Sequence, residues 1–444
     1  MAEKSLSVSI KAVKRGLTED DTSHLQQIDT LQYRPLETPV AVTLNRDIPR
    51  GNLLLRGARL ITMNDYEIIE NGDIYIQNNR IRSIGASGTL DTPANITTVD
   101  VSGKTIIPGL VDTHAHLRPH TGIHRKQIWS YLANLAYGVT TTRDPQTGTT
   151  DVLTYEDQVR AGHILGPRIY STGPGVFYAE QIKNQEHARN VLKRYSQYYD
   201  TKTLKMYVSG NRQQRQWIIK AAREQQLMPT TEGALNFKLN MTQVIDGYPG
   251  HEHSFPIFPI YPDVVQLVAE SRTVYTPTLL VSYGGPWAEN YFYATENVHD
   301  DIKLQYWTPH QHLDSKTRRR GSTRGGSGWF MPEEHVFEEH GVFLKELIDA
   351  GGRAGVGSHG QLQGLGYHWE LWAMQAGGLS EHDALRVATV IGAEGIGLGK
   401  DLGSLEPGKL ADLVILDQNP LQNIRNTNTV SQVMLNGRLY DANT

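Results

Sequence analysis

Residues 106–116 read IIPGLVDTHAH, an apolar run that passes through Pro-Gly and ends in two histidines separated by one residue. In an extended strand, side chains two residues apart point to the same side, so this stretch predicts that Asp112, His114 and His116 share one face. Two imidazoles at this spacing can bind one divalent cation, and a neighbouring carboxylate can orient them. The stretch therefore predicts a buried strand that ends at a metal site.

The segments that follow alternate between strand-like and helix-like patterns. Helical stretches such as 212–226 and 261–271 separate most of the strand-like segments, which lie at 106–116, 139–144, 168–172, 203–208, 228–232, 251–254, 274–278 and 353–359. Eight βα units are the number found in a (β/α)₈ TIM barrel, whose active sites collect at the carboxyl ends of the strands. The sequence therefore predicts an α/β fold with a TIM barrel at its centre.

Both ends of the chain have a different pattern, in which short strands are separated by turn residues. Residues 51–107 and 403–444 predict one small composite β-sandwich domain built from the two chain ends. The barrel is then expected at residues 108–402. Residues 1–50 are polar and weakly patterned, and we interpret them as an N-terminal arm or as the remnant of a larger N-terminal domain.

One connection of the predicted barrel is long. Residues 282–334 are rich in Gly, Trp, Tyr and Arg, and a connection of this length is typical of a lid, a binding loop or a disordered insert. The basic run KTRRR at 316–320 indicates an exposed loop or a contact for an anion. Trp287, Trp307 and Trp329 would either line a substrate pocket or pack the insert.

Two further strands end in residues that can bind a metal. Lys205 lies in the apolar stretch TLKMYV, where a lysine is unfavourable unless it is paired or modified. A carbamylated Lys205 would be an anion that could bridge two metals, whereas an unmodified lysine could extend to the strand end. Glu232 ends MPTTE, where a buried carboxylate requires a cation.

Histidines end two more of the predicted strands. In HEHS, the alternation predicts that His251 and His253 share a face while Glu252 points away, and His359 ends the last strand. A single histidine of this kind is more often a hydrogen-bonded core residue. Their common position at the ends of successive strands favours one metal site.

Composition limits the chemistry and the partners. With no cysteine, a net charge of −4 and 17 histidines, a metal site must use histidine, carboxylates or lysine, and nucleic acid is not expected as a partner. No apolar run is long enough to cross a membrane, and the lysine-rich start has no secretory signal, so we expect a cytoplasmic protein. GSLEPGKL at 403–410 lacks the hydroxyl residue of a phosphate-binding loop, and we interpret it as a turn.

At this point the sequence resembles the amidohydrolase superfamily, in particular its imidazolonepropionase-like branch. The resemblance covers about residues 50–444 and rests on RGARLITM, IIPGLVDTHAH, AYGVTTTRD, EHS, ATVIGAEGIGL and GSLEPGKLADLVILDQNP. SYGGPWAENYFY and GSHGQLQGLGYHWELW are similar to a subgroup that is often fused behind a TolB-like β-propeller. The polar arm at residues 1–50 would fit the join to such a propeller.

The resemblance implies a TIM barrel that hydrolyses its substrate with metal-activated water. The family takes metal ligands from an H-x-H on strand 1, a lysine or glutamate on strand 4, histidines on strands 5 and 6 and an aspartate on strand 8. It thus implies His114, His116, Lys205 and His253 as ligands in this chain. Two positions depart from the family, because strand 5 offers Glu232 instead of histidine and strand 8 offers His359 instead of aspartate.

These departures leave the general base open between Glu232 and His359, both of which could also bind metal. We expect one or two divalent ions, zinc in the first place, and a carbamylated Lys205 is one of the alternatives. Arg143, at the end of strand 2, and His368, just beyond strand 8, are candidates for contact with the substrate.

The function predicted on these grounds is hydrolysis of a carbon–nitrogen bond in a small molecule, an amide or cyclic amide or a dipeptide-like group, with linear peptides excluded. The same site could serve an ester, lactone or phosphotriester hydrolase, because activated water does not dictate the leaving group. A barrel that has lost its catalytic aspartate could also act as a binding protein. Membranes are not expected as partners, and a homo-oligomer is compatible with the superfamily.

Overall fold

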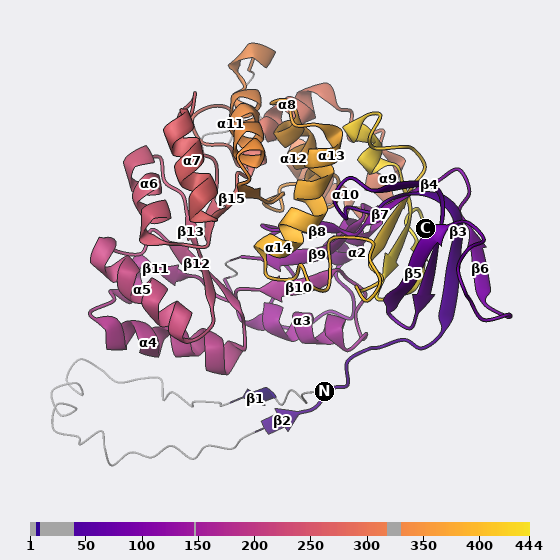
Figure 1. Ribbon diagram of the computed structural model, residues 1–444. Coiled ribbons are helices and arrows are strands. Elements are labelled where there is room, and N and C mark those ends of the chain that lie inside the picture. Colours follow the sequence, from indigo (N-terminus) through magenta and orange to yellow (C-terminus); the bar gives the residue numbers. More distant parts are fainter. Residues whose placement is uncertain (1–5, 9–39, 146–147, 318–329) are drawn as a thin grey trace. The chain divides into compact units, whose positions relative to one another are not determined.

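The computed structural model describes residues 6–8, 40–145, 148–317 and 330–444, and it divides the chain into two units, residues 1–46 and 47–444 (Figure 1). In the first unit, β1 (Leu6–Val8) and β2 (Val40–Val42) form an antiparallel pair. Most of the polar arm predicted at residues 1–50 lies outside the described residues. The second unit contains all the other helices and strands.

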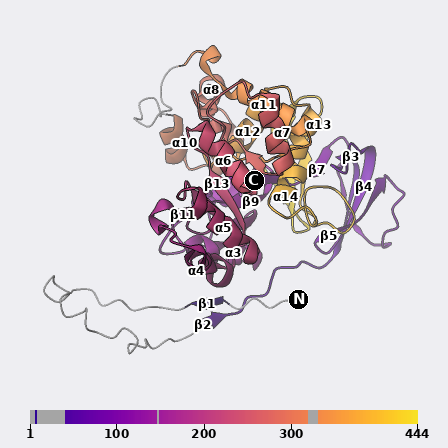
Figure 2. The same cartoon turned by 60° about the vertical axis from the view of Figure 1, so that its left-hand side comes forward.

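Strands from both ends of the second unit join one eight-stranded sheet. Its order is β19-β18-β17-β7-β3-β4-β5, with β6 paired to β3, and Figure 2 shows β3 and β4 at one side of the helices. The strands are β3 (Asn52–Ile61), β4 (Ile68–Gln77), β5 (Arg80–Ala86), β6 (Thr97–Asp100), β7 (Thr105–Pro108), β17 (Leu413–Leu416), β18 (Val430–Leu435) and β19 (Arg438–Asp441). β17 and β18 come from the C-terminal part of this unit and β7 comes from its N-terminal part. The sheet is composite because β17 pairs with both β18 and β7.

The remaining strands form two parallel sheets, with the orders β10-β9-β8 and β11-β12-β13-β14-β15-β16. A parallel bridge between Asp112 and Val356 connects β8 to the segment that follows β16. The strands are β8 (Leu110–Asp112), β9 (Val139–Asp144), β10 (Arg168–Ser171), β11 (Val176–Phe177), β12 (Thr203–Tyr207), β13 (Met228–Glu232), β14 (Gly250–Glu252), β15 (Val274–Thr276) and β16 (Arg353–Ala354).

Helices follow most of these strands and lie outside them (Figure 1). The α-helices are α2 (Trp129–Ala136), α3 (Asp151–Arg160), α4 (Gln185–Lys193), α5 (Arg212–Glu224), α6 (Phe237–Asp246), α7 (Pro262–Ser271), α8 (Ala288–Thr295), α9 (Ile302–Trp307), α10 (His310–Thr317), α11 (Phe337–Asp349), α12 (Leu365–Gln375), α13 (Glu381–Arg386) and α14 (Gly392–Gly395). No helix in the described part of the chain is long and apolar enough to cross a bilayer.

The first predicted strand, 106–116, is in fact two strands that belong to different sheets. β7 ends at Pro108 in the composite sheet, and β8 begins at Leu110 in the parallel sheet. The chain changes sheet at Gly109, where a Cβ atom would lie only 2.0 Å from Oγ1 of Thr140. A side chain at this position would therefore force β8 and β9 apart, which explains why glycine separates the two strands.

Helix α12 is buried along almost its whole length, as is expected of a helix without a polar face. It contacts α8, α11 and α13, and its residues 365–374 are all buried. Trp369 is fully buried and stacks on Phe292 of α8 with ring centroids 5.2 Å apart. The motif GYHWELW is therefore part of the hydrophobic core.

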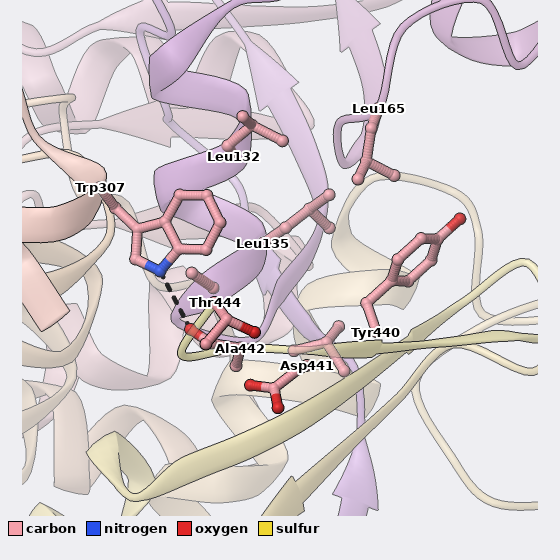
Figure 3. Close-up of a pocket in the computed structure, with 10 residues that line it drawn as sticks. Leu132, Leu135, Leu165, Trp307, Tyr440, Asp441, Ala442 and Thr444 are labelled. Atoms are coloured by element: carbon pink, nitrogen blue, oxygen red, sulfur yellow. Dashed lines mark hydrogen bonds between the residues drawn. The ribbon is translucent and has the colours of Figure 1, made fainter.

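The long insert at 282–334 contains α8, α9 and α10 within its described part. The arginines of KTRRR, residues 318–320, and Trp329 lie outside the described residues. Trp307 of α9 donates a hydrogen bond from Nε1 to the carbonyl oxygen of Ala442 at 3.0 Å, and it lines a small pocket of about 130 Å³ with Leu132, Leu135 and Tyr440 (Figure 3). Trp307 therefore packs the insert against β19 and α2.

Candidate metal centre

Three imidazoles converge beyond the carboxyl ends of β8 and β16. The ligand nitrogens of His114, His116 and His359 all lie within 4.8 Å of one another, and Nε2 of His114 is 3.0 Å from Nε2 of His116. Two nitrogens that bind one zinc ion tetrahedrally at 2.0–2.1 Å lie about 3.3 Å apart. The spacing of these three residues, here called the imidazole triad, therefore suits a single shared ion.

The histidines of the site lie outside the strand ladders, which end at residues 112, 252 and 354, earlier than predicted. His116, His253 and His359 have positive φ angles of 43°, 72° and 57°, a backbone conformation that costs a non-glycine residue roughly 1–3 kcal/mol. The amide of His359 donates to the carbonyl oxygen of His114 at 2.7 Å, and the amide of His253 donates to that of Thr276 at 2.8 Å. These bonds hold the strained histidines over the strand ends.

The other three predicted ligands form a second group, here called the ion-paired triad. Nζ of Lys205 lies 2.7 Å from Oε2 of Glu232, and Oε1 of Glu232 lies 2.9 Å from Nε2 of His253. Lys205 is fully buried, while the side chain of Glu232 is 17% exposed. The ring of His253 lies 5.3 Å from that of His114 and 5.2 Å from that of His359, so the two triads adjoin.

Both nitrogens of His253 have partners. Its Nδ1 lies 2.6 Å from Oγ1 of Thr278, which follows β15, and Nε2 faces Glu232. Tyr283 stacks on the imidazole with ring centroids 5.1 Å apart, and its hydroxyl lies 3.4 Å from Oε1 of Glu232. The hydroxyl of Thr278 and the ring of Tyr283 therefore fix the orientation of His253 toward Glu232.

Tyr283 is itself held through its backbone. Its amide donates to Oγ of Ser254 at 2.8 Å. Nε2 of His340 in α11 donates to its carbonyl oxygen at 2.9 Å. Burial lowers the pKa of His340 to about 4, which keeps this imidazole neutral near pH 7. The start of the long insert is thus fixed over the ion-paired triad.

Glu252 supports the imidazole triad from inside the parallel sheet. Its Oε2 lies 2.6 Å from Nδ1 of His114, and its Oε1 accepts a hydrogen bond from Nη1 of Arg143 at 2.6 Å. Arg143 also donates to Oγ1 of Thr203 at 2.8 Å and to Oγ1 of Thr230. Because Glu252 accepts the Nδ1 proton of His114, the Nε2 lone pair of that histidine is available for a metal.

The prediction for the HEHS stretch is wrong in two respects, because Glu252 points into the parallel sheet and His251 does not share the face of His253. The ring of His251 packs outward, with centroids 5.0 Å from Phe255 and 6.3 Å from Tyr275. The alternation holds through β14 but ends there, since the chain leaves the ladder at His253 with a positive φ angle. The change of backbone conformation brings His253 back toward the site.

Asp112 holds the two chain segments of the imidazole triad together. Its carboxylate accepts hydrogen bonds from the amide of His114 at 3.0 Å, from Oγ of Ser358 at 2.5 Å and from the amide of Ser358 at 3.3 Å. Ser358 directly precedes His359, so one carboxylate positions the residues that follow β8 and the residues that follow β16. Asp112 thus lies behind the ligands rather than among them.

The electrostatics of the imidazole triad fit a divalent cation. Burial lowers the pKa of His114, His116 and His359 well below the ordinary value, and neighbouring positive groups lower it further. All three rings are therefore neutral and can offer lone pairs near pH 7. The buried Nδ1 of His359 has no hydrogen-bond partner among the described residues, and an ion or a water would satisfy a buried polar atom of this kind. The residues present therefore fit a metal.

The electrostatics of the ion-paired triad differ. Burial would raise the pKa of Glu232, but the charges of His253 and Lys205 outweigh it and hold the pKa well below the ordinary value. Glu232 is therefore an anion near pH 7. Its carboxylate lies between the imidazole of His253 on one side and Nζ of Lys205 on the other.

The two residues predicted to contact a substrate lie away from solvent. Arg143 is buried behind the imidazole triad, where its partners are Glu252 and two threonines. His368 is buried in α12, between Oγ1 of Thr427 at 3.0 Å and the carbonyl oxygen of Tyr137 at 2.9 Å. Arg143 therefore positions Glu252, and His368 joins α12 to its neighbours without touching either triad.

Sequence reasoning did not identify Glu252, Thr278 and Tyr283 as parts of the site. Glu252 is flanked by the two histidines of HEHS, and its partner Arg143 ends a different strand. A buried glutamate and a buried arginine, each near the carboxyl end of a parallel strand, would have indicated an ion pair. Thr278 and Tyr283 carry no such signal, because their roles depend on how the chain turns after β15.

Comparisons with known proteins agree with this arrangement. The profile of the amidohydrolase family matches residues 105–440. The chain is 22% identical to an imidazolonepropionase of Geobacillus sp. (strain WCH70) over 85% of this chain and 92% of the relative. It is also 22% identical to a guanine deaminase of Escherichia coli (strain K12) over 82% and 86% of the two chains.

Solved structures are similar as well. The crystal structure of a Xaa-Pro dipeptidase with bound methionine in its active site superposes with a TM-score of 0.66 and 19% identity, over 88% of this chain and all of that one. This likeness shows the fold, which is TIM-barrel-like with mixed α/β composition.

Proposed function

Because the chain belongs to the amidohydrolase family, we propose that it is a metal-dependent hydrolase that cleaves a carbon–nitrogen bond. The observation that carries the proposal is the imidazole triad, in which the ligand nitrogens of His114, His116 and His359 lie within 4.8 Å of one another. Because Nδ1 of His114 donates its proton to the carboxylate of Glu252, Nε2 of His114 carries no proton. Such an arrangement has no evident use in a barrel that only binds a ligand.

Zinc is the proposed metal, because three neutral imidazoles with one open position are typical of catalytic zinc sites. A bound zinc ion supplies two effects, a water whose pKa is lowered to about 7 and polarisation of the carbonyl group under attack. His114, His116 and His359 would hold the ion. In this assignment the lone pair of His359 binds the ion. His359 therefore cannot also accept a proton as the general base.

Glu232 is the proposed general base. It is an anion that is partly exposed at the mouth of the site, whereas the carboxylates of Asp112 and Glu252 are buried and bonded to residues behind the imidazole triad. Lys205 and His253 hold the two oxygens of Glu232 in place. A carboxylate in this position can accept the proton of the attacking water at Oε1 and return it to the leaving nitrogen.

The proposed substrates are small amides, including cyclic amides and dipeptide-like compounds. The likeness to a Xaa-Pro dipeptidase brings dipeptides into the set to be tested, although linear peptides were excluded on the sequence alone. Esters, lactones and phosphotriesters use the same chemistry and form the alternative class. The replacement of the strand 8 aspartate by His359 is the observation that would favour a non-catalytic binding protein.

Metal analysis combined with a substrate panel tests the proposal. The full chain, loaded with zinc, is assayed by elemental mass spectrometry and with N-acyl amino acids, Xaa-Pro dipeptides, cyclic amides and chromogenic esters. His114→Ala, His116→Ala and His359→Ala should each lose metal and activity, while the exposed control His163→Ala should keep both. Absence of bound metal, together with unchanged activity of His114→Ala, would overturn the proposal. Turnover of esters alone would favour the alternative class.

A further inference from the structure

Two aromatic side chains stack on each other at the carboxyl ends of β11 and β12. Phe177 is the register partner of Tyr207 in this parallel pair of strands. Their rings lie nearly parallel, at an angle of 15°, with centroids 4.7 Å apart. The hydroxyl of Ser209 donates to the carbonyl oxygen of Val176 at 2.8 Å, which ties the segment that follows β12 to β11. The backbone therefore fixes the place of both rings.

The stacked pair continues a row of side chains that begins at the ion-paired triad. Side chains two residues apart in a strand point to the same side, so Tyr207 shares the face of Lys205. Nζ of Lys205 lies 5.0 Å from the centroid of the Tyr207 ring and 2.7 Å from Oε2 of Glu232. The ring of Phe177, stacked on Tyr207, extends this row away from Glu232.

The outer end of the row is exposed and apolar. Phe177 is 41% exposed, and the residues that follow the two strands, Tyr178 and Val208, are 67% and 39% exposed. A single exposed apolar side chain is ordinary. Three of them at the ends of two paired strands, next to a polar site, are typical of a surface that binds a ligand.

We infer that Phe177 and Tyr207 bind an aromatic ring of the substrate, so that the hydrolase prefers amides that carry such a ring near the bond that is cleaved. The inference rests on the proposed function and names the substrate class of its site. A third ring can pack on an aromatic pair in an offset-stacked or edge-to-face arrangement. The two residues thus act on specificity.

A second aromatic side chain near Glu232 supports this assignment. The hydroxyl of Tyr283 lies 3.4 Å from Oε1 of Glu232, whereas the row that leads to Phe177 begins at Oε2. Aromatic side chains therefore lie on both sides of the proposed general base. Such surroundings offer apolar area and few hydrogen bonds, which favours a ring over a small or charged group.

Paired substrates test the inference on the zinc-loaded full chain. Phenylacetylglycine and acetylglycine contain the same amide bond and differ in the phenyl ring. In the wild type, kcat/KM for phenylacetylglycine should exceed that for acetylglycine at least about tenfold, the usual effect of burying an aromatic ring. Phe177→Ala should reduce this ratio at least about fivefold. Tyr198→Ala is the matched control, because Tyr198 is 71% exposed in the helical segment Arg194–Tyr199, which precedes β12, and it should keep the wild-type ratio.

Two outcomes of this assay would overturn the inference and leave the hydrolase intact. One is an equal kcat/KM for the two amides in the wild type. The other is an unchanged ratio in Phe177→Ala that has the circular dichroism of the wild type. Phe177→Leu, which keeps an apolar side chain but removes the ring, replaces Phe177→Ala if that variant does not fold.

A binding measurement tests the aromatic pair without turnover. In saturation-transfer difference NMR on the zinc-free full chain, the ring protons of phenylacetylglycine should receive saturation from the wild type and from Tyr198→Ala, and much less from Phe177→Ala. No transfer from the wild type would contradict the inference whether or not the chain is a hydrolase. Transfer to the ring in a chain that binds no metal and hydrolyses no compound would overturn the proposed function alone. A dimer that Phe177→Ala converts into a monomer would identify the exposed residues as an interface between copies and contradict the inference.

Discussion

Glu252 and His114 are joined by a contact of 2.6 Å between Oε2 and Nδ1, although the two residues are 138 positions apart in the chain. The carboxylate also accepts a hydrogen bond from Arg143, so a buried arginine, a buried glutamate and a histidine of the imidazole triad form one chain of contacts. The contact sets the tautomer of His114 and the direction of its Nε2. The affinity of the site for metal should therefore depend on residues that never touch the ion.

Glu252→Gln should weaken zinc binding about 10- to 100-fold, the usual effect of removing a carboxylate behind a histidine ligand. The amide is less able than the carboxylate to stabilise the Nδ1 proton of His114, so the ring becomes a weaker ligand. Competition with a chromogenic chelator measures the affinity, and the exposed Glu270→Gln is the matched control. Equal affinities of the wild type and Glu252→Gln would show that Glu252 does not tune the site.

Arg143→Met should destabilise the fold by about 3–5 kcal/mol, because it leaves the carboxylate of Glu252 buried without its partner. Urea unfolding of the metal-free chain measures the loss, with Arg223→Met on the exposed face of α5 as control. Adding Glu252→Gln to Arg143→Met should recover part of the stability, since no buried charge then remains unpaired. If the double variant is less stable than Arg143→Met alone, the ion pair is not the cause.

Glu370 should make stability depend on pH. This buried carboxyl group accepts hydrogen bonds from the backbone amides of Leu279 at 2.7 Å and Leu280 at 2.9 Å, in the turn that follows Thr278. Burial raises its pKa to about 8, so the folded chain keeps its proton between about pH 4.5 and 8 while the unfolded chain releases it. The stability that the protonated group contributes is present below pH 4.5 and is lost as the pH rises toward 8.

Glu370→Gln removes this titration. The free energy of unfolding of Glu370→Gln minus that of the wild type should rise by up to about 1.4 kcal/mol for each pH unit between pH 4.5 and 8. Urea unfolding at pH 5, 6.5 and 8 measures the trend, and the exposed Glu346→Gln in α11 should show none. A difference between Glu370→Gln and the wild type that stays constant from pH 5 to 8 would contradict the raised pKa.

Gly377→Ala should destabilise the protein because α11 and the end of α12 touch through glycines. A Cβ atom at Gly377 would lie 1.9 Å from the carbonyl carbon of Gly341, a backbone atom that cannot move aside alone. Overpacking of this kind costs about 1–3 kcal/mol. Thermal unfolding measures the loss, and Gly148→Ala, where a Cβ would meet nothing within 4 Å, should leave the midpoint unchanged.

Much of the site could be predicted from residue types at strand ends. His114, His116 and His359 lie together as expected, and Lys205, Glu232 and His253 lie beside them. The division into two triads could not be predicted, because it depends on which atoms face each other across neighbouring strands. The direction of Glu252 was predicted incorrectly for a related reason, since the alternation of a strand ends where the chain leaves the ladder.

By itself, the sequence determined the position and order of eight of the nine strands of the two parallel sheets in the described part of the chain, all but β11, and the residue types available for chemistry. These follow from local hydrophobic patterns and turn residues, which act over a few positions. Only the tertiary structure decided the partners, such as the hydrogen bond between Ser358 and Asp112, which are 246 positions apart. Such contacts form when strands distant in sequence are brought side by side. They also hold the positive φ angles that direct His116, His253 and His359 toward their triads.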